Sequence, residues 1–321
     1  MAPPFDKALG HASQPIPTNW NQRDILLYAA GIGAKQDELQ FTYELSPNWH
    51  AFPTYPLVLG LKLDSTSVND FSKAKDAGGS TPGLPHMDAT KIVHAEQSIE
   101  ILKQIPAESG PGWKIVKKTV GIKDTGKGLI VDGAIELQDS KGEVYVRMIS
   151  SSYAFGKYTK KEDGTEGYAK SVAPKQPVKG GKPPAREPDH VMSEKTLLEQ
   201  AMLYRLSGDY NPLHHDGGKI GRSLGFKGAI LHGLCSYGHA ARALVLKVAN
   251  GDGTRLKYMS ARFSSPVMPG DELETSMWVS DDAASGGIRV DFTQKVKNTG
   301  KVCLQGGVAL FAKEGSRASK L

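Results

Sequence analysis

Apolar residues recur at two different spacings in the C-terminal part of this chain. From Gly233 to Val248, small and apolar residues repeat every three or four positions, which predicts a helix that can lie close against a sheet. After it, apolar and polar residues alternate between turns that contain Gly, Pro or Asn. The strands predicted from this alternation are Tyr258–Ser264, Glu272–Ser280, Gly287–Val296 and Lys301–Lys313. A further helix, capped by Ser193 or Asp189 and running to Ser207, is predicted ahead of them.

The N-terminal part repeats this order of elements. A helical pattern near Asn21–Ala30 and an apolar stretch around Pro53–Leu63 come first. Four strand patterns follow, at Lys91–Ile101, Lys114–Ile122, Gly128–Gln138 and Glu143–Phe155. One helix against several antiparallel strands, present twice in the chain, indicates an α+β repeat.

A stretch rich in Lys, Gly and Pro, residues 157–190, separates the two parts. It carries much of the net charge of +6, and its composition is typical of a solvated linker. A nucleic-acid-binding patch is the alternative, but the stretch lacks the interleaved aromatic and basic residues of such modules, so we expect no nucleic-acid partner. We therefore predict an N-terminal half at 1–156, the linker at 157–190, a C-terminal half at 191–315 and a tail at 316–321.

The composition of the 321 residues, 39% hydrophobic and 23% charged, is that of a globular protein. No run approaches the roughly 18 apolar residues that a membrane-spanning helix needs, so no membrane span is expected. The two cysteines, Cys235 and Cys303, indicate a reducing compartment without a disulfide framework.

The chain ends in Ser319, Lys320 and Leu321. A C-terminal Ser-Lys-Leu is an address that the peroxisomal import receptor reads. We therefore predict that the protein lies in the peroxisomal matrix and that this receptor is one of its partners.

The run Tyr204–His214, YRLSGDYNPLH, holds the densest polar chemistry of the chain. Asp209 and His214 lie five residues apart across a kink, because the proline between them disfavours helix at the residue before it. A carboxylate and an imidazole that converge can hold a water molecule and move protons to and from it. Asn211 adds an amide that can fix this water. The alternative interpretation is a capped helix end, with Gly208 past its last residue and Asp209 opening a turn.

A second motif, AILHGLC, places Gly233 at the start of the predicted long helix. The first N–H groups of a helix have no partner within it and carry partial positive charge. Glycine also lets a ligand oxygen come close to the backbone. The motif therefore indicates an oxyanion-binding position, with a glycine needed only for helix–sheet packing as the alternative.

Together the two motifs resemble those of the (R)-specific 2-enoyl-CoA hydratases, the hydratase 2 or MaoC-like family. The likeness covers nearly the whole chain and is greatest to the hydratase 2 unit of peroxisomal multifunctional enzymes of type 2. It implies a double hot-dog fold, that is, two helix-on-antiparallel-sheet repeats. It also implies an acyl-CoA substrate, a homodimer, no cofactor and no metal.

The resemblance further implies a set of contacts with the substrate. Those in and beyond the signature are Tyr210, Pro212, Leu213 and Phe263. In the first half His94 matches a family contact, whereas Ala95 stands where the family has glycine. Thr125 replaces a CoA-binding lysine of the family, so Lys123 and Lys127 are candidate substitutes.

The resemblance implies reversible hydration of a trans-2-enoyl-CoA to the (3R)-3-hydroxyacyl-CoA in peroxisomal β-oxidation. Asp209 and His214 would share the water, with either as the base, while the Gly233 N–H stabilises the enolate. A related dehydratase acting on another acyl thioester, a hot-dog thioesterase and a non-catalytic acyl-CoA carrier remain alternatives.

The first half lacks this signature, so the resemblance implies that it is catalytically silent and accommodates the acyl tail. Most of its apolar residues are expected in the core, and a minority should border a tunnel that leads from Asp209. The candidates are Ile25, Leu26, Leu57, Val58, Leu59, Ile99, Ile101 and Phe155.

Overall fold

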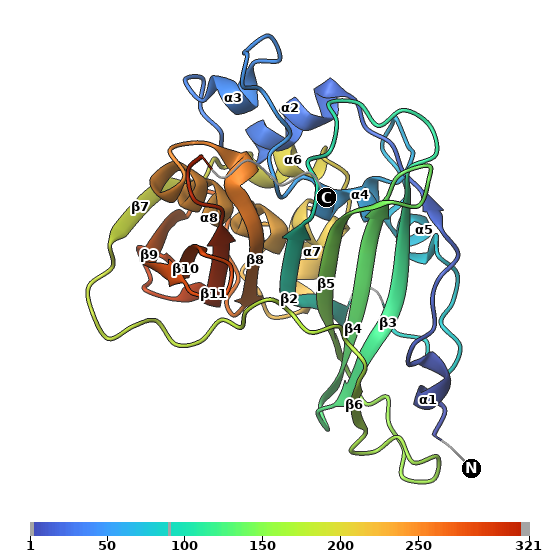
Figure 1. Ribbon diagram of the computed structural model, residues 1–321. Helices are drawn as coiled ribbons and strands as arrows, with labels where there is room; N and C mark the ends of the chain where they lie inside the picture. Colours follow the sequence, from blue (N-terminus) through green and yellow to red (C-terminus); the bar gives the residue numbers. More distant parts are fainter. Residues whose placement is uncertain (1–2, 89–90, 316–321) are drawn as a thin grey trace.

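The structure, a computed structural model, describes residues 3–88 and 91–315 (Figure 1). The predicted targeting residues Ser319, Lys320 and Leu321 therefore lie outside the described residues.

The strands of the described chain form one antiparallel sheet. The first half and the linker contribute β1 (Ile16–Pro17), β2 (Ile92–Ile101), β3 (Lys114–Asp124), β4 (Gly128–Gln138), β5 (Val144–Phe155) and β6 (Ala169–Ser171). The second half contributes β7 (His190–Lys195), β8 (Leu256–Phe263), β9 (Glu272–Asp282), β10 (Gly287–Val296) and β11 (Val302–Phe311). The eight long strands follow the alternating patterns of the sequence closely. Their order is β1-β3-β4-β5-β2-β8-β11-β10-β9-β7, with β6 paired to β3.

The two halves meet at the centre of this sheet, where β2 pairs with β8 (Figure 1). The pairing runs from Glu96 opposite Arg262 to Glu100 opposite Tyr258. Two helix-covered antiparallel sheets joined edge to edge in this way give the double hot-dog architecture that the family resemblance implies.

Helices cover the sheet and connect its strands. In the first half they are α1 (Phe5–Ala8), α2 (Gln22–Gly31), α3 (Leu39–Thr42), α4 (Pro56–Lys62) and α5 (Phe71–Asp76). In the second half they are α6 (Gln200–Arg205), α7 (Lys219–Ser223) and α8 (Gly233–Val248), with 3-10 turns at Pro212–His214 and Gly253–Arg255. The helix predicted near Asn21–Ala30 is α2, and Asn21 caps it in a reciprocal pair of hydrogen bonds with Asp24.

The helix predicted from Gly233 is α8, which is buried along most of its length against the second-half strands. Its Tyr237 hydroxyl donates to the Met259 carbonyl of β8 at 2.7 Å. The element that covers the first-half strands is the much shorter α4, whose Leu57, Val58 and Leu59 are buried. The two sheets are therefore covered to different extents.

The helix predicted to run from Ser193 or Asp189 to Ser207 is wrong in its first half. Residues 190–195 form the edge strand β7, in which Ser193 lies opposite Glu274. Asp189 caps no helix, because its carboxylate accepts the Val279 N–H at 2.7 Å. Edge pairing with β9 thus takes precedence over helix formation here, and α6 begins only at Gln200.

Close backbone contacts lock the two halves together. A side chain at Gly238 of α8 would lie 2.3 Å from Ile32, just beyond α2. The Arg242 guanidinium, also on α8, forms ion pairs with Glu38 of the first half and with Glu194 of β7. Because Arg242 is only 2% exposed, removing both carboxylates would leave its charge buried without a partner.

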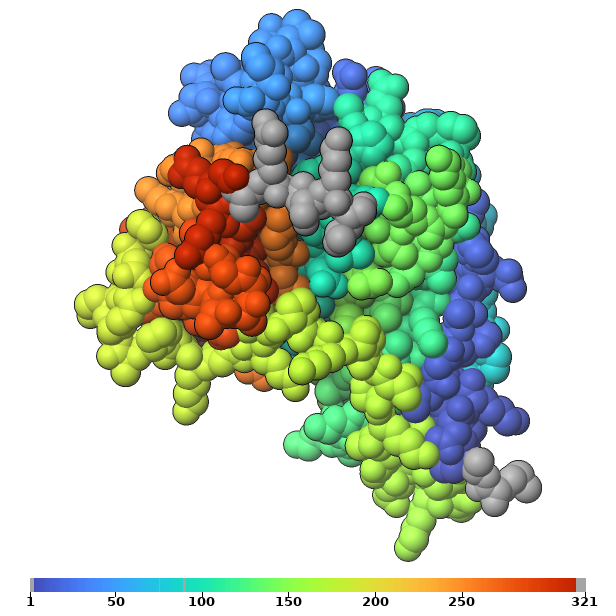
Figure 2. All heavy atoms as spheres, in the orientation of Figure 1, coloured from blue at the N-terminus to red at the C-terminus, as the bar shows by residue number. Residues whose placement is uncertain are grey.

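The segment 157–190 between the halves is mostly exposed but docked at several points. Its β6 pairs with β3, and the Trp278 indole N–H donates to the Arg186 carbonyl at 2.8 Å. In Figure 2 its yellow-green atoms run along the lower side of the visible face, from the first-half strands to the second-half strands.

None of the helices in the described part of the chain combines the length and the apolar character needed to cross a bilayer.

Candidate active site

The signature loop begins directly after α6 and turns at Gly208. This glycine has a φ of 130°, which residues with a side chain rarely adopt. A Cβ atom here would also lie 2.6 Å from the Lys62 side chain at the end of α4. Gly208 therefore lets the loop that carries Asp209 rest directly on the first half.

A single turn of 3-10 helix, Pro212–His214, closes the loop. The Asn211 side-chain oxygen accepts the Leu213 N–H at 3.0 Å and so caps this turn. This bond uses the oxygen of the Asn211 amide and leaves its NH₂ group, which can only donate, for other partners. Asn211 lines the cavity described below.

The turn brings the two predicted proton-transfer groups together. Asp209 and His214 are each 8% exposed. The His214 Nδ1 atom lies 2.8 Å from the Ile230 carbonyl oxygen. Because a carbonyl can only accept, Nδ1 must carry the proton, and in the neutral ring Nε2 then presents its lone pair.

A third ionisable group, His232, lies beside this pair, and we did not single it out in the sequence. Its ring stacks on that of His214 with centroids 3.8 Å apart, and its Nε2 lies 3.1 Å from the Asp209 carbonyl oxygen. The carboxylate of Asp209 and one nitrogen of each ring lie within 4.8 Å of one another. The motif AILHGLC could have pointed to His232, since this histidine directly precedes Gly233, the glycine predicted to bind the oxyanion.

Burial governs the protonation of all three groups. It raises the pKa of Asp209 above its usual range, against the opposing effects of His214 and the Asn211 N–H. It lowers the pKa of His214, which the Asp209 charge partly offsets. Burial, and then the neighbouring His214, holds the pKa of His232 well below its usual range. Burial therefore favours the uncharged form of each of the three groups.

A carboxylate with two imidazoles is also a set of metal-ligand types. The two rings, however, are stacked with only 31° between their planes. Lone pairs lie in the ring planes, so the nitrogens of stacked rings cannot both point at one ion at the roughly 2.0–2.1 Å of a zinc–imidazole bond. The geometry is better suited to proton transfer.

Gly233 opens α8 on the other side of the same space. A Cβ atom at Gly233 would lie 3.1 Å from the ring of Phe263, which in turn packs on the ring of His94 with centroids 4.8 Å apart. Gly233 thus places the N-terminal, positive end of α8 at the cavity beside an aromatic ring. Its role in binding an oxyanion stays a prediction.

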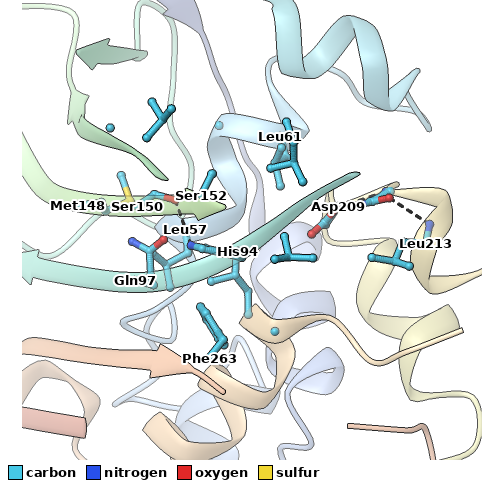
Figure 3. A pocket seen from close by; sticks show the side chains of 18 of the residues that line it. Leu57, Leu61, His94, Gln97, Met148, Ser150, Ser152, Asp209, Leu213 and Phe263 are labelled. Atoms are coloured by element: carbon cyan, nitrogen blue, oxygen red, sulfur yellow. Dashed lines mark hydrogen bonds between the residues drawn. The ribbon is translucent and has the colours of Figure 1, made fainter. Parts of the chain in front are cut away.

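These groups face a single cavity of about 610 Å³ that crosses from the second half into the first. Asp209, His214 and Gly233 line one end of it, and Phe263 lies next to them. In Figure 3 Asp209 and Leu213 face His94, Gln97, Ser150 and Met148 across the open space. The His94 Nε2 and Ser150 Oγ atoms are hydrogen-bonded at 3.0 Å.

The cavity extends into the first half, and a minority of the eight apolar candidates line it, as expected. Of the eight candidates, Leu57 and Phe155 border the cavity, while the other six do not. The apolar wall in the first half is formed instead by Leu61, Phe71, Met87, Ile92, Val93, Val131, Ile135 and Met148. Burial in the core and exposure to a cavity look alike in a sequence, because both select apolar residues.

The other predicted contacts are divided between the cavity and its surroundings. His94, Leu213 and Phe263 line the cavity. Ala95, Tyr210 and Pro212 lie outside the cavity lining. Ala95 forms the bulge of β2, and Pro212 is exposed. The Tyr210 ring lies under the Arg205 guanidinium, 5.1 Å from it. Lys123 and Lys127 are exposed and lie outside the lining, so a CoA contact for either stays a prediction.

Two family matches cover most of the chain. Residues 19–156 match the MFE-2 hydratase 2 N-terminal domain, and residues 179–301 match the MaoC like domain. The fold and these matches define a hydro-lyase of the hot-dog class.

Three curated relatives agree with these matches. A probable dehydratase NIT22 of Ajellomyces capsulatus is 40% identical over 281 residues, which are 86% of this chain and 71% of that protein. The probable enoyl-CoA hydratase 2 of Dictyostelium discoideum is 33% identical, over 97% of this chain and 98% of its own length. The peroxisomal multifunctional enzyme type 2 of Drosophila melanogaster is 34% identical, over 89% of this chain but only 45% of its own length. The chain therefore belongs to the MaoC-like hydratase 2 family.

Solved structures agree on the fold. The MaoC-like dehydratase of Phytophthora capsici is 36% identical and superimposes with a TM-score of 0.83, over 98% of this chain and 99% of that one. A Mycobacterium tuberculosis protein described as a double hot-dog fold has a TM-score of 0.55 at 11% identity, over 96% of this chain and 97% of that one. This second likeness concerns the fold alone.

Proposed function

We propose that this enzyme adds water reversibly to a trans-2-enoyl-CoA and forms the (3R)-3-hydroxyacyl-CoA. The observation that carries the proposal is the placement of a buried carboxylate–imidazole pair across a cavity from the start of α8. One side of this space can handle protons, and the other can stabilise negative charge on an oxygen.

In the proposed reaction the thioester oxygen lies in the slot at Gly233, and C3 faces Asp209 and His214. A water molecule donates one hydrogen to the Asp209 carboxylate and the other to the lone pair of His214 Nε2. As the water oxygen bonds to C3, His214 takes its proton and the electrons of the double bond move to the thioester oxygen. The Gly233 N–H stabilises this enolate, a contribution of roughly 10²–10³ in rate for one such donor. C2 then takes the proton, and His214 is neutral again.

The assignment of His214 as the base rests on two contacts. Its Nδ1 proton is held by the Ile230 carbonyl, so the free Nε2 atom is an acceptor in the ground state. The imidazolium that forms lies beside the Asp209 carboxylate, whose charge favours it. His232, stacked behind His214 and bonded to the Asp209 backbone, would hold both groups in place.

Incubation with trans-2-decenoyl-CoA tests the activity. We expect loss of the enoyl absorbance without release of free CoA. Release of free CoA would instead support the thioesterase alternative. The product should be oxidised by an (R)-specific 3-hydroxyacyl-CoA dehydrogenase and not by an (S)-specific one, and the reverse result would contradict the family stereochemistry.

A related dehydratase that acts on another acyl thioester is the second candidate, because the 40%-identical relative carries the name probable dehydratase. Hydration and dehydration are the two directions of one reaction and use the same residues. A panel of 3-hydroxyacyl thioesters carried by CoA or by acyl carrier protein would separate the two, since the proposal expects the CoA ester to react faster.

We also propose that the enzyme acts in β-oxidation in the peroxisomal matrix. The C-terminal Ser319-Lys320-Leu321 and the peroxisomal name of one relative support this location. An N-terminal fluorescent fusion should be punctate and should become cytosolic when the three residues are deleted. Unchanged puncta after the deletion would contradict import through this tripeptide.

A homodimer is proposed on the family resemblance. An apolar surface at α6 supports it, since Leu197, Leu198, Met202 and Leu206 are between 42% and 76% exposed. Light scattering should give twice the mass of 34.5 kDa. A single-chain mass at micromolar concentration would contradict it.

A further inference from the structure

The end of the cavity that lies farthest from Asp209 is polar. It is lined by three consecutive residues of β3, Lys117, Lys118 and Thr119, and by His11 and Ser13 of the N-terminal segment. Gly78, Gly79 and Thr81 of the loop after α5 complete it. An alkyl chain needs none of these groups, so their presence calls for a ligand of different chemistry.

Hydrogen bonds hold these three segments together. The Ser13 N–H donates to the Lys117 carbonyl at 2.8 Å, and the Thr119 N–H donates to the His11 carbonyl at 3.0 Å. The Gln14 N–H donates to the Gly78 carbonyl at 3.3 Å. The N-terminal segment therefore lies along β3 like an extra strand, as its blue trace beside the green strands shows (Figures 1 and 2). The polar end is a built part of the fold.

Lys117 is the charged group best placed inside this end. Its ammonium group lies under α4, where it donates to the Gly60 carbonyl at 3.4 Å, and Gly60 itself lines the cavity. A Cβ atom at Gly60 would lie 3.6 Å from the Lys117 side chain, so the lysine packs directly under this residue of α4.

The charges along the cavity are unequally distributed. Among the described residues that line it, Asp209 is the only acidic one, and it belongs to the catalytic end. Lys117 and Lys118 lie at the other end. The sheet order β2-β5-β4-β3 separates the two ends by three strand spacings, roughly 14 Å. An extended acyl chain that starts beside Phe263 would cross β2, β5 and β4 before reaching Lys117.

We propose that the preferred substrate carries a carboxylate at the far end of its acyl chain and that Lys117 binds this carboxylate. The inference rests on the proposed function. A carboxylate would form a charge-assisted hydrogen bond with the ammonium group. A methyl end at the same place would bury polar groups of this wall without offering them a hydrogen bond, which is unfavourable.

The test compares matched substrates of eight, ten and twelve carbons with and without the terminal carboxylate. We expect the wild-type enzyme to hydrate the carboxylated ester of one length about tenfold more efficiently, as kcat/KM, than the plain ester. Lys117→Gln should abolish this preference and leave kcat/KM for crotonyl-CoA unchanged. Lys114→Gln, a lysine of the same strand outside the cavity lining, should keep the preference.

Phosphate groups of CoA are the other anions that could reach Lys117. In that case Lys117→Gln would lower kcat/KM for every CoA ester, crotonyl-CoA included, and would not affect the corresponding pantetheine esters. That outcome, or an equal preference for plain and carboxylated chains in the wild type, would overturn the proposal. If the wild type hydrates no enoyl-CoA at all, the proposed function itself fails. The preserved activity of Lys117→Gln on crotonyl-CoA serves as the control for folding.

Discussion

The two halves of this protein share one plan but differ in the helix that covers their strands. The α8 helix has 16 residues, about 24 Å, whereas α4 has 7 residues, about 10 Å. The longer helix fills the space over the second-half strands with buried side chains. The shorter one leaves room on the first-half strands, and the cavity occupies that room. Shortening one helix of a repeated fold is thus a direct way to create a binding volume.

The residues that precede the two helices also differ between the halves. The helix α8 begins with Gly233 directly after His232, and the loop before it carries Asp209 and His214. The helix α4 begins with Pro56 after Tyr55, and the Gly-Asp-x-Asn-Pro-x-His signature does not occur in the first half. We propose that the second half carries out proton transfer and that the first half provides volume for the acyl chain. The predictions below test this division.

The largest effect is expected from the proton-transfer pair. Asp209→Asn and His214→Gln should each lower kcat for hydration by at least about 10²-fold, because each removes a proton-transfer partner. His215→Gln, which changes the neighbouring exposed imidazole, is the matched control and should be close to wild type. Circular dichroism checks the fold. Near-normal activity of either folded variant would contradict the division.

A smaller loss is expected from Gly233→Ala. Its Cβ atom would lie 3.1 Å from the Phe263 ring and would narrow the slot for the thioester oxygen, so kcat/KM should fall on the order of 10-fold to 10²-fold. Gly228→Ala is the control, since its Cβ atom would meet only Met268 at 3.9 Å. Combining Gly233→Ala with Phe263→Leu should recover part of the loss. Full activity of the single variant would show that the slot is not used.

Filling the first half should affect long substrates selectively. In the wild type kcat/KM should rise from crotonyl-CoA to decenoyl-CoA, because each buried methylene contributes about 0.8 kcal/mol. Leu61→Trp, on the cavity side of α4, should lower kcat/KM for decenoyl-CoA about tenfold and that for crotonyl-CoA much less. Leu102→Trp changes an exposed leucine outside the lining and serves as the control. Equal losses on both substrates would mean that the first half only supports the fold.

The smallest expected effect is the change of kcat/KM with pH. The active state needs His214 neutral and Asp209 ionised. Burial lowers the pKa of His214 from the ordinary 6.5, so kcat/KM should change by less than about twofold between pH 8 and pH 6.5. Below that, activity should fall as His214 and Asp209, whose pKa is raised from 3.8, take up protons. A half-maximal point at or above pH 6.5 would contradict the lowered pKa of His214. The first-half imidazole His94, with a pKa of about 4, does not contribute to this acid limb above pH 5.

Most of the strands, and the closeness of Asp209 to His214, could be predicted from the sequence. Period-2 alternation located the eight long strands, since successive side chains of a strand point to opposite faces of the sheet. The signature placed Asp209 and His214 in one turn, because five residues with a proline allow few other arrangements. The helix proposed across Ser193 failed, since pairing with β9 is a long-range contact that local propensity does not contain.

The finer features of the site depend on contacts that the spacing of residues along the sequence does not reveal. His232 lies 18 positions after His214, and only the fold stacks their rings. The bulge of β2 at Ala95 shifts the alternation, so that His94 and Gln97 both face the cavity although three positions separate them. On β3 a second irregularity lies between Thr119 and Gly121, and the lysines that line the cavity, Lys117 and Lys118, precede it. The sequence did not single them out, because spacing does not reveal which strand residues face a cavity.

The pairing of β2 with β8 has a consequence for how the molecule can assemble. Each of these strands is the inner edge of its own half, and each satisfies the backbone N–H and C=O groups of the other. A fragment cut within segment 157–190 would expose a long unpaired strand edge, which is a template for aggregation. The two fragments should therefore be insoluble when produced separately and should reconstitute one another when produced together. Each half would then depend on the other for its solubility.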